Sequence, residues 1–253
     1  MERMGLPCAW IRVGFAVAVL LGASQALAAP AITIDISSPG AGYASYLLTQ
    51  EGAENPDGTF GLSGIVDGAA YGTNFNCDWS IVVNPDPQVT STFTLTNISA
   101  VTQTFIMNVT LPIGVFGPTT VQGGFYGDGL TGTTYTDTNG SGNVTLATVG
   151  ANTFYNALVN GISSQALGNF TVSAPVSGSL PQQTWGTPIP SAPFGPASGN
   201  IRISWQFSLT AGDSVSTKGF FQVEQTPQPA PEPATVALVG LGLAALALAR
   251  RRA

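Results

Sequence analysis

Apolar and polar residues alternate strictly in the clearest segment of the chain, residues 201–210. Ile201 and Trp205 are among the apolar members, and a polar residue follows each apolar one. Successive side chains of a strand point to opposite faces, so this period predicts a strand with an apolar inner face and a polar outer face. Residues 89–96 and 103–111 show the same pattern with turn-like residues between them, and they predict an antiparallel hairpin.

The rest of the middle region also has the pattern of short strands separated by glycine and proline. Only residues 43–50 and 154–159 suit short helices, and the proline-rich residues 176–200 predict a long loop or strap. Many short strands with such punctuation predict an all-β fold, a single antiparallel β-sandwich. The other predicted strands are residues 32–36, 60–66, 80–83, 121–126, 143–148, 169–173 and 219–224.

The type of sandwich stays open between an immunoglobulin-like and a jelly-roll arrangement. Residues 92–111, which end in Leu111 before Pro112, resemble the strand pair of immunoglobulin-like bacterial surface modules. A jelly roll would show the same pattern of short alternating strands.

The first 28 residues have the layout of a secretory signal peptide. Arg3 and Arg12 precede an apolar run at residues 13–22, and an Ala-Leu-Ala sequence ends at Ala28. A basic start, an apolar middle and small residues before the cleavage site predict removal of residues 1–28 by cleavage between Ala28 and Ala29. A retained membrane span is the alternative, but the apolar run is short for a membrane crossing.

The last 23 residues combine three features in a fixed order. A Pro-Glu-Pro sequence comes first, an uncharged apolar run at residues 234–249 follows, and a basic cluster comes last. As a helix the run would be about 24 Å long, slightly short of a hydrocarbon core of about 30 Å. The basic cluster is expected to stay in the cytoplasm, so the tail predicts one C-terminal transmembrane helix with the body across the membrane. The flanking residues are Pro231, Glu232 and Pro233 before the run, and Arg250, Arg251 and Arg252 after it.

This tail resembles the PEP-CTERM sorting signal of exported proteins of Gram-negative bacteria. The resemblance covers residues 231–253 only, and a generic anchor behind a proline linker is the alternative. It implies an exosortase, a membrane protease, as partner and cleavage near Pro231–Glu232–Pro233. It also implies passage across the inner membrane, a transient anchor there, and then a place at the cell surface or outside the cell, among exopolysaccharide and biofilm matrix.

The region between the two predicted cleavage sites is acidic. Residues 29–224 are the expected sandwich body, and residues 225–230 are a proline-rich linker. Residues 29–230 hold eleven acidic residues against only Arg202 and Lys218, a net charge of −9. Nucleic-acid binding requires basic surface that displaces phosphate counterions, so this charge argues against it.

The chain has few of the side chains that common catalytic mechanisms require. The chain has no histidine, which excludes Ser-His-Asp and Cys-His catalysis and histidine-bound zinc. Cys77 is the only cysteine outside the predicted signal peptide and is expected to be a small buried side chain. Carboxylate pairs remain an option for glycoside hydrolysis, with Asp78 beside Trp79 or Asp128 near Tyr126, but the sequence pairs no two acids. We therefore expect a protein that is not an enzyme and has no cofactor.

A weak calcium candidate lies in the glycine-rich residues 123–142. Asp128, Asp137 and Asn139 offer oxygen ligands there, with Asn143 close behind, and oxygen suits a hard cation. The spacing does not match the twelve-residue EF-hand loop. Residues 137–140 are equally well explained as a turn.

Two further features bear on a surface role. Trp185, Phe194 and Tyr135 lie in predicted loops, where they either stack on sugar rings or close the ends of the sandwich. Five Asn-x-Ser/Thr sequences, the acceptor pattern for N-glycosylation, begin at Asn97, Asn108, Asn139, Asn143 and Asn169. Chance produces many such sequences in a chain rich in these residues, so glycosylation is the minor interpretation.

These observations predict an exported, non-enzymatic surface or extracellular-matrix protein that is associated with exopolysaccharide and biofilm. The alternative is a carbohydrate-binding module that links exopolysaccharide to the cell. The expected partners are the exosortase, exopolysaccharide, and the membrane through the C-terminal helix before processing.

Overall fold

The computed structural model describes residues 29–39, 42, 44–84, 86–126, 132–150, 152–187 and 190–226. The predicted signal peptide, the sorting tail and its basic cluster, and the calcium candidate Asp128 lie outside these ranges. Within them, no helix has the length and apolar character needed to cross a membrane.

The described chain is all-β, as the alternation predicted. Its strands form one open antiparallel sheet, and the single short helix is α1 (Gly68–Tyr71), which the side chain of Asp67 caps by accepting from the Ala69 N–H. The strands are β1 (Ala31–Ser37), β2 (Tyr46–Glu51), β3 (Ala53–Glu54), β4 (Phe60–Val66), β5 (Phe75–Asn84), β6 (Gln88–Asn97), β7 (Gln103–Tyr126), β8 (Thr134–Thr136), β9 (Val144–Ala147), β10 (Tyr155–Val159), β11 (Ile162–Leu167), β12 (Thr171–Ala174), β13 (Ser177–Ser179), β14 (Gln183–Trp185), β15 (Ala192–Leu209) and β16 (Ser214–Gln225).

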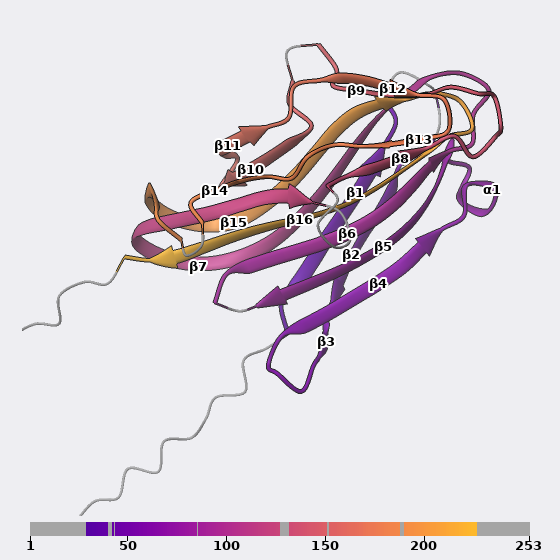
Figure 1. Cartoon of the computed structure of the whole chain (residues 1–253). Helices are drawn as coiled ribbons and strands as arrows, with labels where there is room; N and C mark the ends of the chain where they lie inside the picture. The colour runs from indigo at the N-terminus through magenta and orange to yellow at the C-terminus, as the bar shows by residue number, and fades with distance from the viewer. Residues whose placement is uncertain are drawn as a thin grey trace, which may run out of the picture.

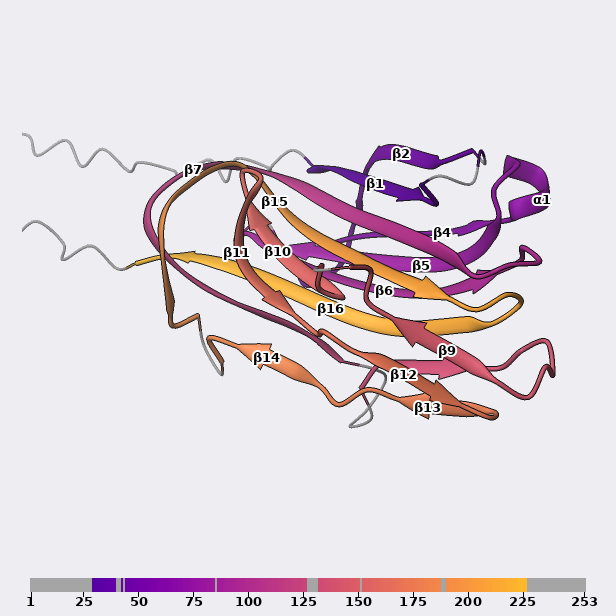
Figure 2. The same cartoon turned by 90° about the horizontal axis from the view of Figure 1, so that it is seen from above.

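Two long strands, β7 and β15, turn the sheet back on itself (Figures 1 and 2). They pair along most of their length, but the register shifts between Phe194 and Gly199, where glycine and proline interrupt β15. Bulges bend strands, and proline is tolerated at them, so these residues account for the curvature. The first half of β7 then pairs with β1, and its second half pairs with β16.

The core lies between the two facing parts of the sheet. Phe93 of β6 lies edge-on to Trp205 of β15 at a centroid distance of 5.2 Å and stacks on Phe207 at 6.2 Å. β6 and β15 are separated in the strand order by β16 and β7, so these contacts run across the core. The alternating apolar residues of β15 from Ile201 to Leu209 are all buried, which confirms the strand with an apolar inner face.

The predicted hairpin of residues 89–96 and 103–111 is wrong. β6 pairs with β5 and β16, whereas the matching part of β7 pairs with β1 and β15. Both strands exist, but the turn after Asn97 carries the chain from one facing part of the sheet to the other. Alternation identifies a strand and its inner face but carries no information about its neighbour.

Both predicted helices are wrong as well. Residues 46–51 form β2, which pairs with β1, and residues 155–159 form β10, which pairs with β15. The spacing of apolar residues alone cannot distinguish short apolar strands from short helices. Both segments became strands because they pair with a neighbouring strand of the sheet. The loop predicted for residues 176–200 is also partly wrong, because it contains β13, β14 and the first part of β15.

Candidate functional site

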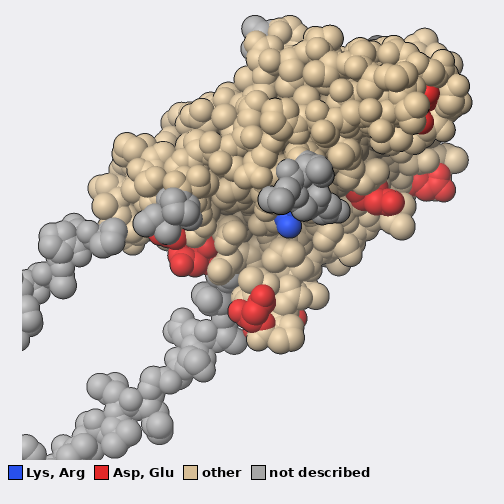
Figure 3. All heavy atoms as spheres, viewed as in Figure 1, with Lys and Arg blue, Asp and Glu red and all other residues tan. Residues whose placement is uncertain are grey.

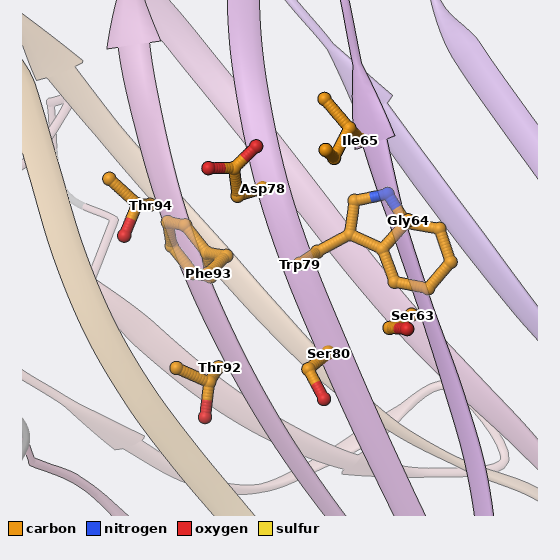
Figure 4. A pocket seen from close by; sticks show the side chains of 9 residues that line it. All are labelled: Ser63, Gly64, Ile65, Asp78, Trp79, Ser80, Thr92, Phe93 and Thr94. Atoms are coloured by element: carbon orange, nitrogen blue, oxygen red, sulfur yellow. The ribbon is translucent and has the colours of Figure 1, made fainter.

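A shallow groove of about 500 Å³ crosses the outer face of β4, β5 and β6. Directly opposed residues of neighbouring strands lie on the same face, so the register places its side chains in two rows. Figure 4 shows these rows, which are Ile65, Asp78 and Thr94 in one and Ser63, Ser80 and Thr92 in the other.

The residues that lie between the two rows along each strand face the inner side of the sheet. Gly64, Trp79 and Phe93 oppose one another there, and the Trp79 and Phe93 side chains are buried. A side chain at Gly64 would collide with the indole of Trp79. Because residue 64 is glycine, the indole of Trp79 fits against the inner side of β4. On the outer face no side chain rises between the two rows, and this forms the floor of the groove.

The groove is lined by four small hydroxyl side chains and one carboxylate, together with Gly64 and the apolar Ile65, Trp79 and Phe93. Asp78 is the only acidic residue among its lining residues, and Ile65 is 69% exposed beside it. Serine and threonine hydroxyls both donate and accept hydrogen bonds, so this surface suits a neutral, hydroxyl-rich ligand better than a charged one.

The same face continues over β16 and β7. The hydroxyl of Thr94 donates to that of Ser216 at 3.0 Å. Further along, Lys218 Nζ lies 5.4 Å from the ring centroid of Tyr126, which packs edge-on against Phe220. A cation over an aromatic face is stabilised by the ring electrons. In Figure 3 acidic side chains lie in a few separate spots on a mostly uncharged surface.

The structure places the sequence-predicted sugar-binding residues differently. Asp78 and Trp79 both line the groove, but they point to opposite faces of β5 and the Trp79 side chain is almost fully buried. Tyr135 is buried, and Trp185 and Phe194 are half-buried and pack against the core. Their placement fits packing against the core better than an exposed sugar platform.

Asp137 organises a tight loop between β8 and β9. Its Oδ1 accepts from the N–H groups of Gly140 at 2.8 Å and Ser141 at 3.1 Å, and its Oδ2 accepts from Gly142 at 2.7 Å. Partial burial raises the pKa of Asp137, but these N–H donors and the side chain of Asp213 outweigh it, and the pKa is lowered. Asn139 Oδ1 also accepts from the Ser141 N–H at 2.7 Å.

Asp213, which sequence reasoning missed, meets this loop from the turn before β16. It is fully buried, and Thr210 Oγ1 donates to its Oδ2, whereas its Oδ1 has no hydrogen-bond partner among the described residues. Burial raises the pKa of Asp213, and the charge of Asp137 raises it further. In the part of the chain that the structure describes, this loop included, no group of three or more His, Cys, Asp or Glu side chains is placed to hold a metal.

Two other candidate residues serve the interior. Cys77 is buried, as expected, and burial raises the pKa of its thiol well above the ordinary value, so the thiol is unreactive at neutral pH. Asn97, the first residue of one Asn-x-Ser sequence, is fully buried. Asn139, Asn143 and Asn169 are exposed.

The C-terminal residues match a known family model. Residues 229–252 match the PEP-CTERM protein-sorting motif, which includes Pro231, Glu232, Pro233 and the basic cluster. The match identifies the chain as one that carries this motif, and the motif indicates export, exosortase processing and sorting to the cell surface in Gram-negative bacteria. The family model covers none of the residues from 29 to 226.

Comparisons of the body are much weaker. No curated protein matched the chain. A solved structure described as TmCBM61 in complex with beta-1,4-galactotriose is similar over 53% of this chain and 71% of that chain, with 11% sequence identity and a TM-score of 0.23. A likeness of this size carries no conclusion about the ligand of this chain.

Proposed function

We propose that the protein is an exported, non-enzymatic component of the cell surface or extracellular matrix, and that an exosortase cleaves it near Pro231–Glu232–Pro233. The observation that carries the proposal is the sorting motif at residues 229–252, which follows a folded all-β body. In this proposal residues 1–28 are removed on export, residues 234–249 anchor the chain transiently in the inner membrane, and Arg250, Arg251 and Arg252 stay in the cytoplasm. The body is a β-sandwich, which the curved sheet supports, and it works among exopolysaccharide and biofilm matrix.

The intact mass of the surface-exposed protein tests this route. We expect a chain that begins at Ala29 and ends near residues 231–233. Replacing both Pro231 and Pro233 by alanine is expected to abolish the C-terminal cleavage, because an extended proline-flanked segment suits a protease cleft. Pro227→Ala, just before the matched motif, is the control. It should be cleaved normally, so the mass of its cleaved body should differ only by the proline-to-alanine difference.

Two results would contradict the proposal. Retention of Arg250, Arg251 and Arg252 in the surface form would show a permanent anchor. Turnover of a polysaccharide by the purified protein would show an enzyme.

A second candidate function is carbohydrate binding by the groove on β4, β5 and β6, which would link exopolysaccharide to the cell. Its hydroxyl rows beside the exposed Ile65 support this candidate, since a sugar presents hydroxyls at its edge and C–H groups on its face. The ligand class is a neutral polysaccharide, because the body has a strong excess of acids that repels anionic chains.

Binding to a glycan array tests the second candidate. Ser80→Arg and Thr92→Arg place long side chains across the middle of the groove, and each is expected to weaken binding by at least about tenfold, the equivalent of 1.4 kcal/mol. Thr49→Arg, on the exposed face of β2, makes the same change elsewhere and should leave binding intact. Binding that survives both groove variants would remove the groove as the site.

A further inference from the structure

Hydrogen bonds join the loop after β8 to the turn before β16. Thr138 Oγ1 donates to the carbonyl of Gly212, and Asn139 Nδ2 donates to the carbonyl of Ala211. These bonds bring the two segments together, and the carboxyl groups of Asp137 and Asp213 lie within hydrogen-bonding reach of each other. Two carboxyl groups from distant parts of the chain therefore share one small site.

A bare pair of carboxylates at this place would be unfavourable. Asp213 is fully buried, and its Oδ1 accepts no hydrogen bond from any described residue. A buried ionised oxygen without a partner costs free energy, and a second negative charge beside it adds to the cost. A bound cation or a shared proton would relieve both.

The loop itself has the order of oxygen ligands found in the first half of a calcium loop. An EF-hand loop uses side chains at positions 1, 3 and 5, glycine at position 6 and a backbone carbonyl at position 7. Asp137, Asn139, Ser141, Gly142 and Asn143 occupy these positions in order. Gly140 and Gly142 have φ of 72° and 81°, so the backbone curls around Asp137 in a conformation that favours glycine.

The second half of such a loop is absent, and Asp213 stands in for it. Position 12, which holds a bidentate glutamate in an EF-hand, is Thr148 here. The missing carboxylate is supplied by Asp213 from another turn, and its buried Oδ1 has no hydrogen-bond partner among the described residues. A carboxylate has about four lone-pair sites, so the three N–H bonds to Asp137 leave that side chain able to bind a cation as well.

We propose that Asp137 and Asp213, together with the neutral oxygens of residues 139–143, bind one calcium ion. Hard oxygen ligands of this number and flexibility suit calcium, whereas magnesium requires a strict octahedron and gives up its water reluctantly. The site joins the β8–β9 loop to the β15–β16 turn, so calcium stabilises that end of the sandwich. This proposal is independent of the exosortase route and of the groove.

Thermal unfolding of the full-length protein in detergent tests the site. Calcium at about 10 mM, which exceeds the dissociation constant of extracellular calcium modules about ten- to a hundredfold, is expected to raise Tm by roughly 3–10 °C over the value in EGTA. Magnesium at the same concentration is expected to produce a clearly smaller shift. Sodium chloride at equal ionic strength controls for screening.

Asp213→Asn is the decisive variant. Its amide has the shape of the carboxyl group and can donate to Asp137, so the fold is expected to survive while the calcium shift disappears. Asp57→Asn is the matched control, because Asp57 likewise holds a turn by accepting from the N–H and hydroxyl of Thr59, and it should keep the full shift.

Three outcomes would overturn the proposal. An equal Tm in calcium and EGTA would mean that a proton joins the two carboxyls. An equal shift with magnesium would mean that the effect is not specific for calcium. A full calcium shift in Asp213→Asn would place the ion elsewhere.

Discussion

Replacing Trp205 by alanine is expected to lower the free energy of unfolding by about 3–5 kcal/mol. Trp205 is fully buried where the facing parts of the sheet meet, and its ring contacts Phe93 at 5.2 Å and Tyr155 at 5.9 Å between centroids. Gly219 provides space for the ring, since a side chain at Gly219 would lie 2.6 Å from Trp205 Cζ2. Strands from both facing parts of the sheet surround the Trp205 ring. The cavity that Trp205→Ala leaves therefore cannot collapse.

Urea unfolding followed by circular dichroism measures this loss. Trp205→Phe keeps an aromatic ring and removes an indole N–H that has no hydrogen-bond partner, so it should cost less than about 1.5 kcal/mol. Val115→Ala, at a side chain that is 88% exposed, should change stability by less than about 0.5 kcal/mol. An alanine variant at position 205 as stable as the control would show that the two facing parts of the sheet do not pack around this ring.

Replacing Asn97 by alanine is expected to lower the free energy of unfolding by about 2–4 kcal/mol, because it leaves one buried and several part-buried polar groups without partners. Asn97 Nδ2 lies 2.9–3.0 Å from the carbonyl oxygens of Val101, Leu209 and Thr210. Its Oδ1 accepts from the N–H of Ser99 at 3.0 Å and from the Ser99 hydroxyl at 2.7 Å. One side chain thus joins the β6–β7 turn to the end of β15.

Two variants separate the bonds of Asn97 from its shape. Asn97→Asp keeps the acceptor for Ser99 but loses the Nδ2 donor, so its melting temperature should fall about as far as that of Asn97→Ala. Asn169→Ala, at an exposed asparagine, should change stability by less than about 0.5 kcal/mol. If Asn97→Asp were as stable as the parent protein, the three carbonyl contacts would contribute nothing.

Much of the fold followed from local pattern. The strand predicted at residues 60–66 coincides with β4, and the apolar residues of 201–209 are the inner face of β15. The hairpin of β6 and β7 and the helices at β2 and β10 were wrong, because the choice of partner depends on residues far along the chain. Short segments adopt the structure that an open sheet edge offers them.

The candidate sites divide in the same way. Asp137 and Asn139 were recognisable from their glycine-rich surroundings, but Asp213 had no local signal, since its partner Asp137 comes from another turn. The groove also had none, because its rows exist only once β4, β5 and β6 are in register. Asn97 begins an Asn-x-Ser sequence, the acceptor pattern for N-glycosylation, and only its burial revealed a structural role.

The sequence by itself determined the sorting tail, because its motif is one contiguous segment at residues 229–252 that can be recognised without the tertiary structure. It also determined which side of the clearly alternating strands, such as β15, is apolar, since that period is local. The tertiary structure alone decided which strands are neighbours and that Asp137 meets Asp213. Those features depend on packing between distant segments, and a single apolar pattern is compatible with several such arrangements.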